Sequence, residues 1–240
     1  MAGYARRMSF DTGLTRLPTR PLASIASIAF AGEAAGLVAD AFYRAGGPPP
    51  ILESDHFAFS SRDADQPSVS RVRELATGSV DLIVLRRAWN SVDQVAEAIR
   101  ISKDRVASGG EVIAADLDVN RLLAGPTLQY PGRLFYLAAP SSAARLREST
   151  ATPALLGAEA VRASLRPIDG ITYDEVRSSH ESVAELWESI RDRGWRGSAW
   201  TPHDEHGTVL ESVATGLAGA LPIGEVADRE PWYAVIGTRP

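Results

Sequence analysis

Short apolar runs alternate with amphipathic segments through the first half of the chain. Unbroken apolar runs are typical of strands whose two faces are both buried. Such runs lie at residues 24–31, 80–85 and 111–117. Ile51 and Leu52 begin a further short strand, which we expect to end at Glu53 or Asp55. Four strands are therefore predicted before residue 118.

Helices are predicted between these strands, because apolar residues recur there every three or four positions. One helix runs from Leu37 to the Gly46–Gly47 pair, and two others cover 68–76 and 92–106. Residues 108–110, Ser-Gly-Gly, are read as a turn. Strands that alternate with helices indicate an α/β domain with a mostly parallel sheet and right-handed crossovers.

The second half of the chain is less regular. Helices are predicted at 153–165, 182–193 and 205–217, and strands at 171–176 and 232–237. Residues 1–21 show little periodicity and are read as an extended arm that either covers the domain or binds a partner. We expect one domain over 22–240, in which 119–222 contain insertions that shape an acceptor site.

Composition narrows the classes of function. The 240 residues include no cysteine, which excludes disulfides, thiolate metal sites and cysteine nucleophiles. The net charge of −5 argues against a nucleic-acid-binding face. No apolar run reaches the roughly 18–20 residues that span a bilayer, and no signal peptide is recognised, so a cytoplasmic protein is expected. A P-loop and a Gly-x-Ser-x-Gly nucleophile elbow are both missing from the sequence.

A candidate ligand site begins where the first apolar run ends. Gly32 and Gly36 fall between a strand and a helix, and Glu33 and Ala34 lie between them. The free amides of a helix N-terminus and its dipole favour negative groups, and glycine allows close approach. Glu53, 21 positions after Gly32, is placed to accept hydrogen bonds from a ribose. A tight strand–helix turn without a ligand is the alternative reading of the same pattern.

These segments together resemble class I methyltransferases that use S-adenosylmethionine (SAM), in the small-molecule branch with ubiquinone- and menaquinone-type enzymes. The segment IAFAGEAAG at 28–36 is similar to the family's first motif, and Glu53 to its ribose-binding acid. Asp63 lies in a loop that resembles the adenine-binding loop. The most specific stretch is 80–118, which is similar to the family's fourth strand, helix, Gly-Gly turn and fifth strand.

The resemblance implies a Rossmann-like fold whose terminal strand, in EPWYAVIGTRP, is antiparallel. It also implies SAM as the cofactor, with Gly32, Glu33, Ala34, Gly36, Glu53, Asp63 and Trp89 at its site. The first motif departs from the family pattern, because Phe30 replaces its acid and Ala34 its middle glycine. Glu33 inside the turn either orients the SAM ammonium group or obstructs it. The interval between Glu53 and Val80 is short, so one helix of the usual fold is expected to be missing.

Candidate general bases are few. His180 and His203 are the first choices, and His206 is a third, because histidine titrates near neutral pH. Surface histidines are the alternative for all three. No third, distant ligand accompanies His203 and His206, so no metal site is expected. Trp89 either covers SAM or its acceptor, or anchors the following helix in the core.

Two hypotheses follow. The first is SAM-dependent methyl transfer to a small-molecule acceptor. The second is a non-catalytic methyltransferase-like subunit, which binds a protein partner through the arm; a homodimer is left open as well. Neither involves nucleic acid or a membrane span.

Overall fold

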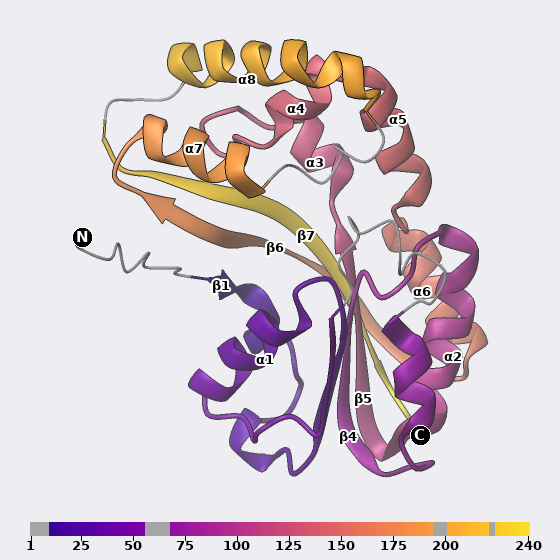
Figure 1. Ribbon diagram of the computed structural model, residues 1–240. Coiled ribbons are helices and arrows are strands. Elements are labelled where there is room, and N and C mark those ends of the chain that lie inside the picture. The colour runs from indigo at the N-terminus through magenta and orange to yellow at the C-terminus, as the bar shows by residue number, and fades with distance from the viewer. Residues whose placement is uncertain (1–9, 56–67, 194–200, 221–223) are drawn as a thin grey trace. The chain divides into compact units, whose positions relative to one another are not determined.

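The computed structural model describes residues 10–55, 68–193, 201–220 and 224–240. Seven strands are hydrogen-bonded in the order β1-β6-β7-β5-β4-β2-β3 (Figure 1). They are β1 (Asp11–Thr12), β2 (Ile28–Gly32), β3 (Leu52–Asp55), β4 (Val80–Arg86), β5 (Val106–Leu117), β6 (Arg166–His180) and β7 (Val226–Thr238). The α-helices are α1 (Ala35–Arg44), α2 (Val95–Arg105), α3 (Val119–Ala124), α4 (Arg133–Ala138), α5 (Pro140–Ser149), α6 (Pro153–Arg162), α7 (Val183–Arg193) and α8 (His206–Ala220).

Strand directions confirm the predicted sheet. Strands β3, β2, β4 and β5 are parallel neighbours, whereas β7 runs antiparallel to β5. The first half alternates strand and helix, as the hydrophobic pattern predicts. The α/β class and the antiparallel terminal strand are therefore both confirmed.

Several predicted boundaries are wrong. Residues 108–110 lie within β5, although Gly109 has a left-handed φ of +76°. Residues 68–74 form a 3₁₀ helix, η3, in place of the expected α-helix. Strands β6 and β7 are much longer than the segments 171–176 and 232–237. Helices α3, α4 and α5 fill 119–149, where the sequence pattern was too irregular to predict them.

The chain divides into two compact units. One comprises residues 12–118, 148–173 and 232–240, and contains the parallel strands. The other comprises residues 1–11, 119–147 and 174–231. Strands β6 and β7 contribute residues to both units. The predicted boundary between arm and domain at residue 21 remains a prediction.

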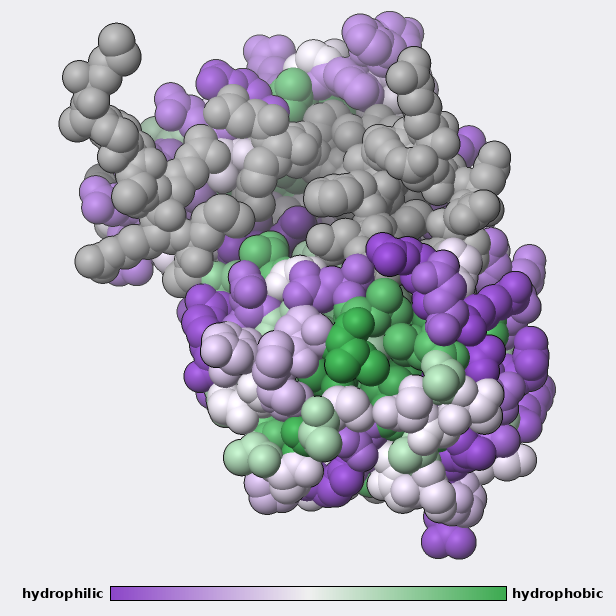
Figure 2. All heavy atoms as spheres, turned by 60° about the horizontal axis from the view of Figure 1, so that its bottom comes forward, coloured by the Kyte–Doolittle hydropathy of each residue, from purple (hydrophilic) through white to green (hydrophobic). Residues whose placement is uncertain are grey.

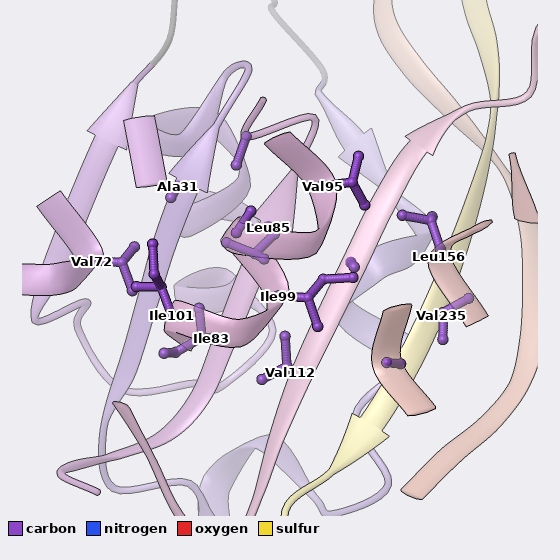
Figure 3. Close-up of a cluster of buried hydrophobic side chains, with 14 of the residues drawn as sticks. Ala31, Val72, Ile83, Leu85, Val95, Ile99, Ile101, Val112, Leu156 and Val235 are labelled. Carbon is purple, nitrogen blue, oxygen red and sulfur yellow. The ribbon is translucent and has the colours of Figure 1, made fainter. Parts of the chain in front are cut away.

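Each unit has its own hydrophobic core. In the unit with the parallel strands, Ile83 and Leu85 of β4 pack with Ile99 of α2 and Leu156 of α6 (Figure 3). All four side chains are almost fully buried. In the other unit, Phe135, Leu186 and Val213 lie at the centre of a second cluster from α4, α7 and α8. Burial of this kind supplies the main stabilising free energy of a fold.

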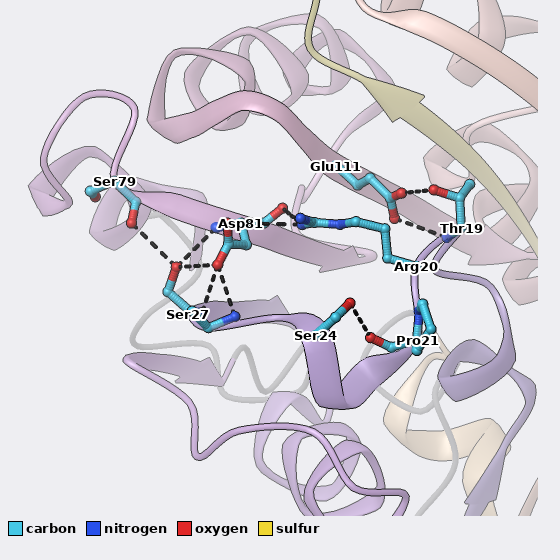
Figure 4. A network of polar contacts seen from close by, with 9 residues as sticks. Thr19, Arg20, Pro21, Ser24, Ser27, Ser79, Asp81 and Glu111 are labelled. Carbon is cyan, nitrogen blue, oxygen red and sulfur yellow. Dashed lines mark hydrogen bonds and ion pairs between the residues drawn. The ribbon is translucent and has the colours of Figure 1, made fainter.

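Part of the predicted arm packs on the unit with the parallel strands. Leu14 is fully buried, and the Thr19 backbone amide donates to the buried carboxylate of Glu111 at 3.1 Å. The Thr19 hydroxyl also bonds to Glu111, and Arg20 reaches the Asp81 carbonyl at 3.3 Å (Figure 4). Residues 12–20 therefore cover the domain, which is one of the two roles expected of the arm.

The surface shown in Figure 2 is mixed, with hydrophobic residues gathered in one area and bordered by hydrophilic ones. In the described part of the chain, no helix is both long and apolar enough to cross a bilayer.

Candidate functional site

The turn after β2 has the conformation expected of a strand–helix ligand turn. Gly32 has a φ of +116°, and Ala34 lies in the left-handed region at +55°. Helix α1 then begins at Ala35, and its N-cap residue, Ala34, makes no side-chain capping hydrogen bond.

Gly32 is required by the protein's own backbone. A Cβ atom built on it would lie 2.0 Å from the carbonyl oxygen of Arg86, at the end of β4. The amide of Glu33 donates to that same oxygen at 2.7 Å. The close approach made possible by this glycine is therefore between the turn and β4.

Arg86 also fills the space beside the turn with its side chain. Its Nη1 donates to the Glu33 carbonyl at 2.6 Å and lies 3.9 Å from the Glu33 carboxylate. The guanidinium carbon is 3.7 Å from the centroid of the Trp232 ring. Arg86 and Trp232 are at most 2% exposed, and Glu33 is 6% exposed. Glu33 is thus enclosed and paired with a cation.

Phe30 and Glu53 occupy neighbouring strands. Phe30 is buried, and its ring packs edge-on against Phe42 of α1 with centroids 5.1 Å apart. Glu53 is exposed and stands opposite Phe30 in the register of β2 with β3, whereas Asp55 stands opposite Gly32. The predicted order of strand, turn, helix, strand and acid is present. Asp63 lies outside the described residues, and the ribose-binding role of Glu53 stays a prediction.

Trp89 lies in the hydrophobic core, 1% exposed. Its indole Nε1 donates to Asp116 Oδ2 at 2.9 Å. This placement corresponds to the packing alternative for Trp89, and contact of its ring with SAM stays a prediction.

Asp116, near the end of β5, lies at the centre of a buried cluster of polar contacts. It accepts hydrogen bonds from the amides of Leu117 and Ala151 as well as from Trp89, and Arg87 Nη1 lies 3.5 Å away. Burial raises the pKa of Asp116 above its ordinary value, although Arg87 and the hydrogen bonds oppose this change. Arg87, with a left-handed φ of +48°, also donates to Ser149 at 2.9 Å. The cluster joins β4 and β5 to the α5–α6 connection.

The histidines belong to the other unit. His180 ends β6, and its Nε2 is 2.9 Å from the Ser178 hydroxyl. His203 is exposed and stacks on His206, whose Nε2 is 2.9 Å from the Thr201 carbonyl oxygen. Within the described ranges, no group of three or more histidine, aspartate or glutamate side chains could hold a metal ion. A base role for His180 or His203 remains a prediction.

Sequence reasoning missed Arg86 and Arg87. The available signal was a pair of arginines directly after an unbroken apolar strand, where a side chain at the strand end faces the ligand edge of a parallel sheet. Their partners could not be identified from the sequence, because Glu33 and Trp232 are distant from Arg86 along the chain, and Asp116 and Ser149 from Arg87.

Comparison with known proteins finds similarity in structure only. No family model matches the sequence, and no curated protein matches it. A SAM-dependent methyltransferase from Archaeoglobus fulgidus aligns with a TM-score of 0.44 and 9% identity, covering 91% of this chain and 88% of that one. YcgJ from Bacillus subtilis aligns with 0.41 and 11%, covering 89% and 91%. An O-methyltransferase family protein from Burkholderia thailandensis gives 0.42 and 9%, covering 94% and 54%.

These identities and TM-scores are low, so the fold assignment rests on the strands themselves. The buried parallel strands, the intervening helices and the antiparallel β7 give the chain a Rossmann-like α/β fold.

The residues present fit SAM in part. The start of α1, where the N-cap side chain of Ala34 makes no capping bond, presents backbone amides, and Glu53 presents an exposed carboxylate on the adjacent strand. These groups suit a carboxylate and a ribose, respectively. The Glu33 carboxylate does not contribute to an open cradle, because it is enclosed beside Arg86. The fit therefore depends on backbone amides and on Glu53.

Proposed function

We propose that the protein is a SAM-dependent methyltransferase that acts on a small molecule, in the branch that its sequence resembles. The observation that supports this proposal is the β2–α1–β3 unit. Its helix begins directly after a turn with two left-handed residues, and the neighbouring parallel strand carries Glu53. Ligands of open parallel sheets bind at the carboxyl ends of the strands, where this turn lies.

In this proposal, backbone amides at Ala34 and Ala35 hold the amino-acid end of SAM, and Glu53 accepts hydrogen bonds from the ribose. When bound, SAM supplies an electrophilic methyl group on a sulfonium. The protein's contribution is mainly to position the acceptor and exclude water, which such a transfer requires. His180 and His203 are the residues proposed to accept a proton from the acceptor.

Calorimetric titration with SAM and with S-adenosylhomocysteine tests the proposal. We expect micromolar binding by the full chain, and its loss in Glu53→Ala. The matched control is Glu97→Ala, since Glu97 is an exposed carboxylate of α2 away from the turn. A folded wild-type protein that binds neither ligand contradicts the proposal.

That negative result would support the second hypothesis, a methyltransferase-like protein without activity. The enclosed Arg86–Glu33 pair is the observation that favours it, because the pair fills space beside the glycine turn with the protein's own side chains. Binding of SAM would show instead that the turn accepts a ligand with this pair in place.

A further inference from the structure

Arg86 bonds to both peptide groups that flank Glu33. Its backbone oxygen accepts from the Glu33 amide at 2.7 Å, and its Nη1 donates to the Glu33 carbonyl at 2.6 Å. Glu33 is the residue between the two left-handed positions of the turn, Gly32 and Ala34. A single residue of β4 thus holds the middle of the turn from both sides.

The guanidinium of Arg86 is also contacted by a third element, β7. The ring of Trp232 in β7 lies 3.7 Å from the guanidinium carbon, and the Glu33 carboxylate lies 3.9 Å from Nη1. A cation enclosed between a carboxylate and an aromatic face has few other positions open to it. Because β7 is the antiparallel strand beyond β5, the turn is tied through Arg86 across the sheet.

The pairing also changes the electrostatics of the turn. An uncompensated carboxylate at the start of a helix would repel an anionic ligand group that the helix dipole attracts. Arg86 compensates the charge of Glu33, so the backbone amides determine which ligand group is favoured there.

We propose that Arg86 is the positioning residue of the glycine turn: it fixes the peptides around Glu33 and compensates its charge, so that the start of α1 receives an anionic ligand group. The ligand part of this inference rests on the proposed function. The other part, that Arg86 fixes the peptides of the turn, concerns this chain alone and is tested without ligand.

Hydrogen exchange in the free protein tests the turn part. The amide of Glu33 bonds to Arg86 and the amide of Val38 bonds to Ala34 at 3.1 Å, so both report on the turn. In Arg86→Met the carbonyl of residue 86 remains and only the side-chain contacts are lost. We expect exchange of both amides to accelerate roughly ten- to a hundredfold, the loss that corresponds to one charge-assisted hydrogen bond. The amide of Ala163, which follows α6 and bonds to the Glu159 carbonyl, should exchange as in the wild type.

Arg87→Met is the matched control, because Arg87 is equally buried and bonds to Asp116 and Ser149 instead of the turn. This variant should leave the exchange rates of the Glu33 and Val38 amides unchanged. If Arg86→Met accelerates Ala163 as much as Glu33, Arg86 acts only on global stability and the proposal is overturned. The double variant Arg86→Met with Glu33→Gln removes both charges of the Arg86–Glu33 pair. It should therefore fold even if the single variant does not. Its Val38 amide should still exchange faster than in the wild type, whereas its Ala163 amide should not.

SAM titration of the same variants tests the ligand part. We expect Arg86→Lys, whose ammonium is a point charge without the planar fork, to weaken binding about tenfold, and Arg86→Met roughly a hundredfold. Unchanged affinity in Arg86→Met would overturn the ligand part. If wild-type protein binds no SAM, the proposed function fails, while the exchange result still decides whether Arg86 positions the turn.

Discussion

At the scale of single residues, the carboxyl ends of β2, β4 and β5 are held together by charged groups with several partners each. Arg86 contacts Glu33 and Trp232, and Asp116 contacts Trp89 and Arg87. A buried ion pair adds little net stability, yet removal of one partner is costly because the other charge remains buried. Substitutions here should therefore have large effects.

Gly32→Ala tests the close approach between the turn and β4. We expect a loss of at least about 3 kcal/mol in the free energy of unfolding, because the new Cβ would meet Arg86 O and the φ value is unfavourable for alanine. Gly46→Ala is the control: Gly46 also has a positive φ, +94°, but nothing lies within 4 Å of its Cβ position. It should lose only about 1–2 kcal/mol. Chemical denaturation measures both, and equal losses would contradict the steric argument.

Asp116→Asn tests the buried carboxyl through pH. Because burial raises the folded-state pKa of Asp116, its contribution to stability is fully present below the unfolded value of 3.8 and is lost as the pH rises through the folded value. Asparagine does not titrate, so the stability difference between wild type and variant should widen as the pH falls. The wild type should therefore gain stability relative to the variant in acid. Thermal unfolding over a pH series measures this, and a difference that narrows in acid would be inconsistent with a raised pKa.

At the scale of elements, the sequence predicted the strands and helices of the parallel region well. Apolar runs such as 80–85 and 111–117 are unambiguous because both faces of these strands are buried. The pattern failed at 119–149, where short helices α3 and α4 have too few turns for a clear period. In β6 it located only residues 171–176, because polar residues such as Ser179 leave the rest of the strand without an apolar run.

The candidate site was predictable only in outline. Spacing located the glycine turn and Glu53, since both depend on local chain order. The enclosure of Glu33 was not predictable, because it depends on Arg86 and on Trp232, almost 200 positions later. Contacts between strands that are distant in sequence leave no spacing signal.

The bound arm offers an element-scale prediction. Glu111→Ala removes the acceptor of the Thr19 amide and hydroxyl, so residues 12–24 should detach more often and be cleaved faster in limited proteolysis. We expect a loss of about 1–3 kcal/mol, the cost of leaving a buried donor without its acceptor. Glu97→Ala, which removes an exposed carboxylate, should leave the cleavage rate unchanged. Equal protection in both variants would mean that the other contacts of the arm, such as buried Leu14 and the Arg20–Asp81 bond, hold it without Glu111.

At the scale of the whole molecule, the chain forms two compact units with separate cores. The proposed SAM site belongs to the unit with the parallel strands, whereas His180 and His203 belong to the other. Ligand protection of each unit can therefore be measured separately, through the hydrogen exchange of its own buried amides.

SAM at about 100 times its dissociation constant should stabilise the folded protein by about 2.7 kcal/mol. Hydrogen exchange should slow in residues 28–53, around the turn and β3. Exchange measured by mass spectrometry with and without ligand checks this distribution. Protection confined to α7 and α8 would place the ligand in the other unit and refute the assignment to the glycine turn.

The left-handed backbone at Ala34 has a consequence for redesign. Alanine tolerates this conformation at some energetic cost, whereas glycine adopts it freely. The main chain at this position therefore already has a conformation that glycine favours. Replacing Ala34 by glycine needs no rebuilding of the loop, so an engineer could make this change before altering any charged neighbour.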